Sequence, residues 1–185
     1  MKVPVLILPG WLNSGPQHWQ SLWERDHPEF RRVQQKDWET PLREDWIARL
    51  DDAVIHCGAP PVLVAHSLGC ATIAHWAEKH TRAVHGALLV APTDLSRPEV
   101  PDALHSFRPM PMKKLPFPSI LVSSSSDPWL SVKRAREVAY AWGSRFENAG
   151  PAGHINSDAG FGPWPMGEML LGELMSGRRE RAGRP

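Results

Sequence analysis

Short apolar runs recur along the chain, and each is followed by a segment whose apolar residues are spaced as on a helix. The runs that we expect to be strands cover residues 3–8, 33–38, 61–65, 86–91, 119–123 and 145–148, of which the second and the last have the weakest pattern. Most runs are continuously apolar rather than alternating, which indicates strands covered on both faces, as in a parallel sheet between two helix layers.

The segments between the runs predict five amphipathic helices. Their apolar faces comprise Trp19, Leu22 and Trp23; Trp46, Ile47, Leu50 and Val54; Cys70, Ile73, Ala74 and Ala77; Val132, Ala135, Val138 and Ala139; and Met166, Met169, Leu170 and Leu174. Because strands and helices alternate, the pattern predicts an open α/β sheet of about six parallel strands with right-handed crossovers. No internal repeat and no Gly/Ser-rich linker divides the chain, so we expect a single domain over residues 1–175.

Two segments fall outside the alternation of strands and helices. Residues 92–118 contain seven prolines, so we expect only short helical pieces there and otherwise a course over the surface. A long loop after a strand is also a candidate rim or lid for a site. The tail at 176–185 is basic and polar, and we expect it to be a disordered end rather than a nucleic-acid-binding arm.

Composition places the chain among ordinary globular proteins. Its 185 residues are 42% hydrophobic and 22% charged, with 21 Lys and Arg against 20 Asp and Glu. This balance provides no field to attract nucleic acid or an anionic membrane, so we expect neither partner. The first apolar run is too short for a signal-peptide core or a membrane span, which predicts a cytoplasmic protein. We expect Cys57 and Cys70 to be buried free thiols. The oligomeric state is left open.

One joint between a strand run and a helical pattern carries a candidate nucleophile. Residues 65–69 read Ala-His-Ser-Leu-Gly. A serine on a sharp strand-to-helix turn is held in a strained conformation with its hydroxyl above the sheet. Such a turn is crowded and needs small residues two places before and after the serine, here Ala65 and Gly69, although glycine is usual at the first place. Ser67 is the candidate nucleophile, and a simple helix cap is the alternative reading.

A serine hydroxyl is a weak nucleophile unless a histidine takes its proton and an acid orients that histidine. In α/β-hydrolases the acid and then the histidine follow the serine along the chain, each after a later strand. Asp127 follows the fifth run, and His154 lies in a Gly/Pro-rich loop after the last one. We therefore expect Asp127 to be the acid and His154 the base. Asp94 is the alternative acid, and the serines at 123–126 are expected only to crowd a strand end.

Such a site also needs two backbone N–H groups that converge on the developing oxyanion. The N–H of Leu68, at the start of the helix after the serine, is one candidate. The other is the N–H of Trp11, because Gly10 allows the chain after the first strand to pass close to the nucleophile. A Pro-Gly turn with a purely structural role would look the same in the sequence.

Several aromatic side chains are candidates for the wall of the site. Trp11, Trp129 and Trp164 fall in loops that should meet above the sheet, and His18 lies near the Pro-Gly turn. His18 also suits the start of a helix without any catalytic duty. The chain has no H-E-x-x-H motif and no paired cysteine motif, so we expect no metal and no cofactor.

Four stretches together resemble a known family. They are LPGWLNSGPQHWQSLWE, VLVAHSLGCATIAHWA, SSSSDPW and GHINSDAGFGPWPMGE. They resemble the small serine hydrolases grouped with the retinoblastoma-binding serine hydrolase and the YdeN-type bacterial proteins, over nearly the whole chain. The resemblance implies a compact α/β-hydrolase fold with no large cap domain and without the two antiparallel strands that often precede it. It also implies Ser67 as nucleophile, Asp127 as acid and His154 as base.

The expected reaction is acyl transfer to water. The substrate would be a small molecule with an ester, thioester or activated amide group. A peptidase that cleaves amides from an amino terminus would use the same residues. A protein-binding module that keeps the fold but does little catalysis is the alternative from another class, and the presence of all three candidate side chains argues against it.

Overall fold

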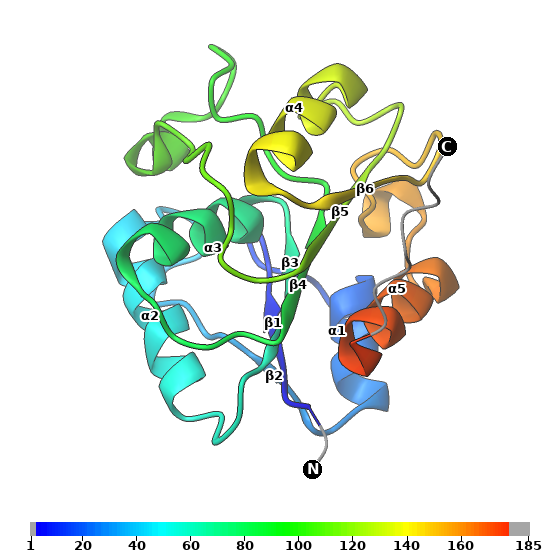
Figure 1. Ribbon diagram of the computed structural model, residues 1–185. Coiled ribbons are helices and arrows are strands. Elements are labelled where there is room, and N and C mark those ends of the chain that lie inside the picture. Colours follow the sequence, from blue (N-terminus) through cyan, green and yellow to red (C-terminus); the bar gives the residue numbers. More distant parts are fainter. Residues whose placement is uncertain (1–2, 178–185) are drawn as a thin grey trace, which may run out of the picture.

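Six strands form one all-parallel sheet in the computed structural model, which describes residues 3–177 (Figure 1). The strands are β1 (Val5–Leu8), β2 (Phe30–Arg32), β3 (Val62–His66), β4 (Gly86–Val90), β5 (Ser119–Ser123) and β6 (Arg145–Asn148). Their order across the sheet is β2-β1-β3-β4-β5-β6. The prediction of a parallel sheet of about six strands is therefore confirmed.

Helices cover both faces of this sheet, as the continuous apolar runs predicted. Figure 1 views the sheet edge-on, with α2 and α3 on one side and α1 and α5 on the other. The helices are α1 (Trp19–Asp26), α2 (Arg43–Ile55), α3 (Leu68–Lys79), α4 (Val132–Trp142) and α5 (Pro165–Ser176). Successive residues along each strand point alternately into two cores. Leu6 and Leu63 pack with α2, α3 and α4, whereas Val5 and Val62 pack with α1 and α5. Each such buried aliphatic side chain contributes about 1.5–3 kcal/mol.

The strand expected at 33–38 is wrong. The edge strand β2 comes earlier and pairs in parallel with β1, and of the predicted run only Val33 extends it by donating its N–H to the carbonyl of Ile7 at 2.9 Å. The hydrophobic pattern misses β2 because two of its three residues are arginines. Arg32 forms an ion pair with Glu24 on α1. A charged side chain therefore stands at a strand position where the hydrophobic pattern looks for an apolar residue.

The proline-rich segment 92–118 is more closely packed than expected. It contains one short 3-10 helix, η1 (Asp102–Phe107), as the prolines predicted. However, the apolar side chains between the prolines are buried against the α2, α3 and α4 face; they are Leu95, Val100, Leu104, Phe107, Met110, Leu115 and Phe117. Prolines prevent a long helix, but they do not prevent burial of the residues between them.

Both cysteines are free, as expected. Cys70 is buried, whereas Cys57, which was also expected to be buried, is only half-buried. No helix within residues 3–177 is long and apolar enough to cross a membrane. Most of the tail predicted to be disordered, residues 178–185, lies outside the described residues.

Candidate active site

Ser67 occupies a sharp turn between β3 and α3. Its φ of 54° and ψ of −121° lie in a region that side-chain-bearing residues rarely adopt, and its N–H donates to the carbonyl of Val90 at 3.0 Å. Gly69 makes the turn possible, because a Cβ there would come within 2.4 Å of the carbonyl oxygen of Leu8. The strained turn expected from the sequence is present, and the end of β4 holds it in place.

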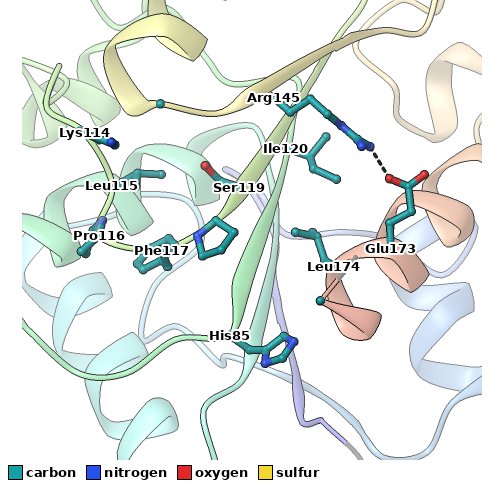
Figure 2. Close-up of a pocket in the computed structure, with 13 residues that line it drawn as sticks. His85, Lys114, Leu115, Pro116, Phe117, Ser119, Ile120, Arg145, Glu173 and Leu174 are labelled. Carbon is teal, nitrogen blue, oxygen red and sulfur yellow. Dashed lines mark hydrogen bonds and ion pairs between the residues drawn. The ribbon is translucent and has the colours of Figure 1, made fainter. Parts of the chain in front are cut away.

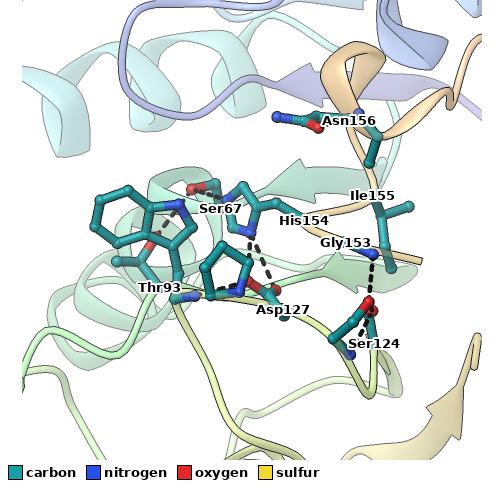
Figure 3. Close-up of polar contacts among 12 residues, drawn as sticks. Ser67, Thr93, Ser124, Asp127, Gly153, His154, Ile155 and Asn156 are labelled. Carbon is teal, nitrogen blue, oxygen red and sulfur yellow. Dashed lines mark hydrogen bonds and ion pairs between the residues drawn. The ribbon is translucent and has the colours of Figure 1, made fainter. Parts of the chain in front are cut away.

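The side chains of Ser67, His154 and Asp127 form a continuous hydrogen-bonded chain (Figure 3). His154 Nε2 lies 2.9 Å from Ser67 Oγ, and His154 Nδ1 lies 3.0 Å from each carboxylate oxygen of Asp127. The Asp127 side chain is 1% exposed and that of His154 is 11% exposed. A carboxylate only accepts hydrogen bonds, so Nδ1 carries the proton and Nε2 of the neutral imidazole is free to accept the serine hydrogen.

The alternative acid, Asp94, is engaged elsewhere. Its Oδ1 accepts hydrogen bonds from the backbone N–H and the hydroxyl of Ser96, the latter at 2.6 Å, and lies 3.6 Å from Arg134 Nε. The carboxylate that meets the imidazole of His154 is that of Asp127. Its Oδ1 also accepts from the N–H of Trp129 at 2.8 Å, which fixes the carboxylate in position.

The loop that presents His154 is held by serines that follow β5. Ser124 Oγ accepts from the N–H of Ala152, and Ser126 Oγ accepts from the N–H of Gly153, both at 2.9 Å. We expected these serines only to crowd the strand end, and the hydrogen bonds show a more specific role. They tie the loop carrying His154 to the loop carrying Asp127, so these two side chains are positioned together.

Downstream of His154, Asn156 shapes the same loop. Its side chain accepts from the N–H of Ala159 at 3.1 Å and caps the short helix η2 (Ser157–Ala159). Gly160 then ends that helix with a φ of 84°, a conformation that favours glycine. Through these contacts Asn156 and Gly160 shape the loop that presents His154.

Two further histidines are buried beside His154. His66 Nε2 donates to the backbone carbonyl of His154 at 2.8 Å, and the ring of His18 lies 4.8 Å from that of His66. Burial lowers the pKa of His18 to about 3, with smaller contributions in the same direction from the charge of Arg32 and from His154 when that imidazole is protonated. Burial and the neighbouring histidines also hold the pKa of His66 well below its usual value. Both imidazoles are therefore neutral at ordinary pH.

His18 itself is 4% exposed and caps α1, because its Nδ1 accepts from the backbone N–H of Gln20. This agrees with the reading of a helix-start histidine and gives no support to a place on the wall of the site. Trp164 is also misplaced by the prediction. It is 3% exposed and packs on Trp19 and Trp23, since the start of α5 lies over α1 rather than above the sheet edge.

The other two tryptophans remain near the site. The ring of Trp129 lies 6.3 Å from that of His154 and is half-buried. Trp11 is also half-buried, and its Nε1 donates to the carbonyl of Glu39 at 2.8 Å. Gly10 brings this segment against Ser67, because a Cβ at Gly10 would lie 2.7 Å from the Cβ of Ser67.

Sequence reasoning missed Thr93. Its hydroxyl lies 2.9 Å from Ser67 Oγ, and the residue is 3% exposed (Figure 3). The available signal was its place three residues after the end of β4, at the same sheet edge as the other candidate residues. The neighbouring Asp94 was considered instead.

A hollow lies at the opposite edge of the sheet (Figure 2). It measures about 730 Å³ and is lined where β4, β5 and β6 begin, by residues that include His85, Ser119, Arg145 and Glu173. None of the candidate catalytic residues lines it. Within residues 3–177, no group of three or more His, Cys, Asp or Glu side chains is arranged to hold a metal ion.

Comparison with other solved structures shows close likeness in fold. A protein described as a YdeN-like hydrolase from Pectobacterium atrosepticum is 32% identical, with a TM-score of 0.85 over 95% of this chain and 91% of that chain. The ydeN gene product of Bacillus subtilis is 22% identical, with a TM-score of 0.78 over 94% and 99%. A monoacylglycerol lipase from Paleococcus ferrophilus is 13% identical, with a TM-score of 0.68 over 96% and 97%.

No protein with a curated description matches the chain. A family model, described as serine hydrolase, matches residues 5–173. The match covers all six strands and nearly all of α5, and it confirms the family resemblance inferred from the sequence motifs. The chain belongs to the serine hydrolase family, and it is an enzyme.

Proposed function

We propose that the protein is an esterase-like hydrolase that cleaves a small ester, thioester or activated amide through an acyl-enzyme intermediate on Ser67. The observation that carries the proposal is the unbroken hydrogen-bonded chain from Ser67 Oγ through His154 to Asp127. Its atoms lie at hydrogen-bonding distance without any rearrangement, which is the arrangement that general-base activation of a serine requires.

In the first step His154 Nε2 takes the proton of Ser67 as Oγ attacks the acyl carbon. Asp127 holds the imidazole in the tautomer that can accept this proton and stabilises the resulting imidazolium. The imidazolium then gives the proton to the leaving group, and the carbon–oxygen, carbon–sulfur or carbon–nitrogen bond to that group breaks. In the second step His154 activates a water that releases the acid and restores Ser67.

The negative oxygen formed in each step needs hydrogen-bond donors already in place. Leu68 opens α3, so its N–H has no earlier helical turn to bind and is available to the substrate. The N–H of Trp11 is the second donor that we propose, because Gly10 places this segment against Ser67. The positive end of the α3 dipole adds to the stabilisation.

Two considerations favour a small acyl group, and a third favours an ester as the substrate. The loops near Ser67 offer the half-buried rings of Trp11 and Trp129 as an apolar wall. Within residues 3–177 no large cap domain covers the sheet edge, so a long acyl chain would have little enclosing surface. Two proteins of the same fold, the lipase from Paleococcus ferrophilus and a carboxylesterase from Bacillus subtilis, are ester hydrolases by name.

A fluorophosphonate probe tests the proposal directly, because it labels only an activated serine. We expect labelling of the native protein and none of Ser67→Ala, together with hydrolysis of short p-nitrophenyl esters by the native protein alone. A folded native protein that resists the probe would instead indicate the protein-binding alternative. Faster cleavage of aminoacyl amides than of esters would indicate the peptidase alternative, and a strong preference for long acyl chains would contradict the small substrate.

A further inference from the structure

We infer that Thr93 is a catalytic residue whose hydroxyl donates a hydrogen bond to Ser67 Oγ and stabilises the negative charge that this oxygen gains during the reaction. The inference rests on the proposed function of Ser67 as the nucleophile. The two hydroxyl oxygens lie 2.9 Å apart, and this distance alone does not say which hydroxyl is the donor.

The direction follows from counting hydrogens. Asp127 accepts from His154 Nδ1, so His154 Nε2 has a lone pair and accepts the single hydrogen of Ser67. Ser67 then has no hydrogen left for Thr93. The contact between the two hydroxyls is a hydrogen bond only if Thr93 is the donor, so in the resting enzyme a fixed O–H group points at the nucleophilic oxygen.

The backbone around Thr93 holds this donor rigidly. The carbonyl of Val90, at the end of β4, accepts the N–H of Ser67 at 3.0 Å, so the strand before Thr93 is bonded directly to the nucleophile turn. On its other side, the N–H of Asp94 donates to the carbonyl of Trp129 at 3.2 Å. Thr93 is therefore fixed between the loop that carries Ser67 and the loop that carries Asp127, and its hydroxyl needs no reorganisation when charge develops.

The donor acts at two moments of the reaction. During acylation the O–H bond of Ser67 breaks, its proton moves to His154 Nε2, and the electron pair left on Oγ forms the bond to the acyl carbon. During deacylation the bond between Oγ and the acyl carbon breaks, and the electron pair returns to Oγ before the proton comes back from His154. Thr93 keeps its own proton throughout and stabilises Oγ whenever that oxygen is electron-rich.

This hydrogen bond differs from an ordinary buried hydroxyl pair. Ser119 and Ser144 form such a pair at 2.7 Å where β5 and β6 begin, far from any candidate catalytic group. There the contact satisfies two polar groups and nothing more. Beside Ser67 the same chemistry acts on an atom whose charge changes, so its removal is expected to affect the rate rather than binding.

The test compares Thr93→Val, Thr93→Ala and Thr93→Ser with the native protein, with Ser119→Ala as the matched control for loss of a buried hydroxyl. The substrate is a short p-nitrophenyl ester, and the rate of fluorophosphonate labelling is measured in parallel. Because hydrogen bonds to charged groups are strong, we expect kcat and the labelling rate to fall roughly tenfold to a hundredfold in the Val and Ala variants, with KM nearly unchanged. Thr93→Ser should recover most of the loss, and Ser119→Ala should keep the native rate.

Each outcome bears on one claim. Native kcat and labelling in Thr93→Val, or a Thr93→Ser variant as slow as Thr93→Ala, would overturn the role of Thr93 while leaving the proposed function intact. The Ala and Ser variants differ only in the hydroxyl, so their ratio decides the matter even if the Val variant folds poorly. Labelling and hydrolysis that persist in Ser67→Ala would overturn the proposed function itself, and the inference about Thr93 with it.

Discussion

The two edges of the sheet differ in how their polar groups are arranged. At the carboxyl edge, the side chains of Thr93, Ser67, His154 and Asp127 form one hydrogen-bonded series with every distance between 2.9 and 3.0 Å. The amino edge has a hollow of about 730 Å³, but the polar contacts described there, such as the ion pairs of Arg145 with Glu147 and Glu173, include no such series of hydroxyl, imidazole and carboxylate. A hollow by itself is therefore a poor guide to chemistry, because reactivity requires groups that act on one another.

The difference arises from the parallel topology. The strands β1, β3, β4, β5 and β6 all end at the same edge, so the loops that follow them meet there. The first turn of α3 also points its free N–H groups toward this edge. The amino ends of the strands receive chain from the far ends of helices, which bring carbonyl groups rather than donors.

The largest expected effect comes from replacing Asp127, the proposed acid at the carboxyl edge. In Asp127→Asn the amide would donate to His154 Nδ1 and force its proton onto Nε2, which could no longer accept from Ser67. We expect kcat for a short ester to fall about a thousandfold to ten-thousandfold. Asp94→Asn is the matched control, and it should stay within about tenfold of the native rate. A large loss of kcat in Asp94→Asn together with a near-native rate in Asp127→Asn would identify Asp94 as the acid.

A smaller loss is expected from crowding the nucleophile. In Gly10→Ala the new Cβ would lie 2.7 Å from the Cβ of Ser67 and 3.2 Å from its Oγ, so the serine must move. A displacement of this size at a reacting atom costs about a hundredfold in kcat. At Gly15 nothing in the described chain lies within 4 Å of an added Cβ, so Gly15→Ala should retain the native rate. Equal rates for the two variants would contradict close contact at Gly10.

The buried histidines predict how stability depends on pH. An unfolded histidine has a pKa of about 6.5, whereas burial lowers the pKa of His18 to about 3 in the folded protein. Below pH 6.5 the unfolded state therefore binds a proton that the folded state does not. Stability should be fully present above pH 6.5 and fall as the pH drops, with the folding equilibrium losing about tenfold per pH unit for each such histidine.

The variant His18→Asn isolates one of these protons, because asparagine can still cap α1. Urea unfolding at pH 7, 6 and 5 should show a shallower loss of stability in the variant, by about one proton. His66, whose pKa is lowered by the same burial, should account for a similar share of the remaining slope. An unchanged slope would mean that His18 is protonated in the folded state.

The smallest effect is expected at the amino edge. Glu173→Gln removes the charge that pairs with Arg145 at 2.6 Å, in a partly exposed position. Such pairs contribute at most about 1 kcal/mol to folding. We expect kcat and KM for the short ester to stay within about twofold of native values. A large loss of activity would show that the two edges are coupled and would contradict the difference described between them.

The amino-acid sequence alone was enough to predict the sheet architecture and to identify the candidate residues. Continuous apolar runs predicted the buried strands because each buried strand packs against a core on both faces of the sheet. The small-x-Ser-x-small joint and the later Asp127 and His154 predicted which side chains meet, because parallel strands gather their carboxyl ends. The structure brings these three side chains into contact, and their catalytic roles are the proposal made above.

The remaining features could be found only in the tertiary structure, because they depend on contacts between separate elements. The strand β2 escaped the hydrophobic pattern because an ion pair between Arg32 and Glu24 replaces apolar burial at the sheet edge. Trp164 looked like a wall of the site, and it became core because α5 packs against α1. The contact of Thr93 with Ser67 joins the ends of two strands. Periodicity reports whether a residue is buried, whereas the neighbour that it meets depends on how separate elements pack.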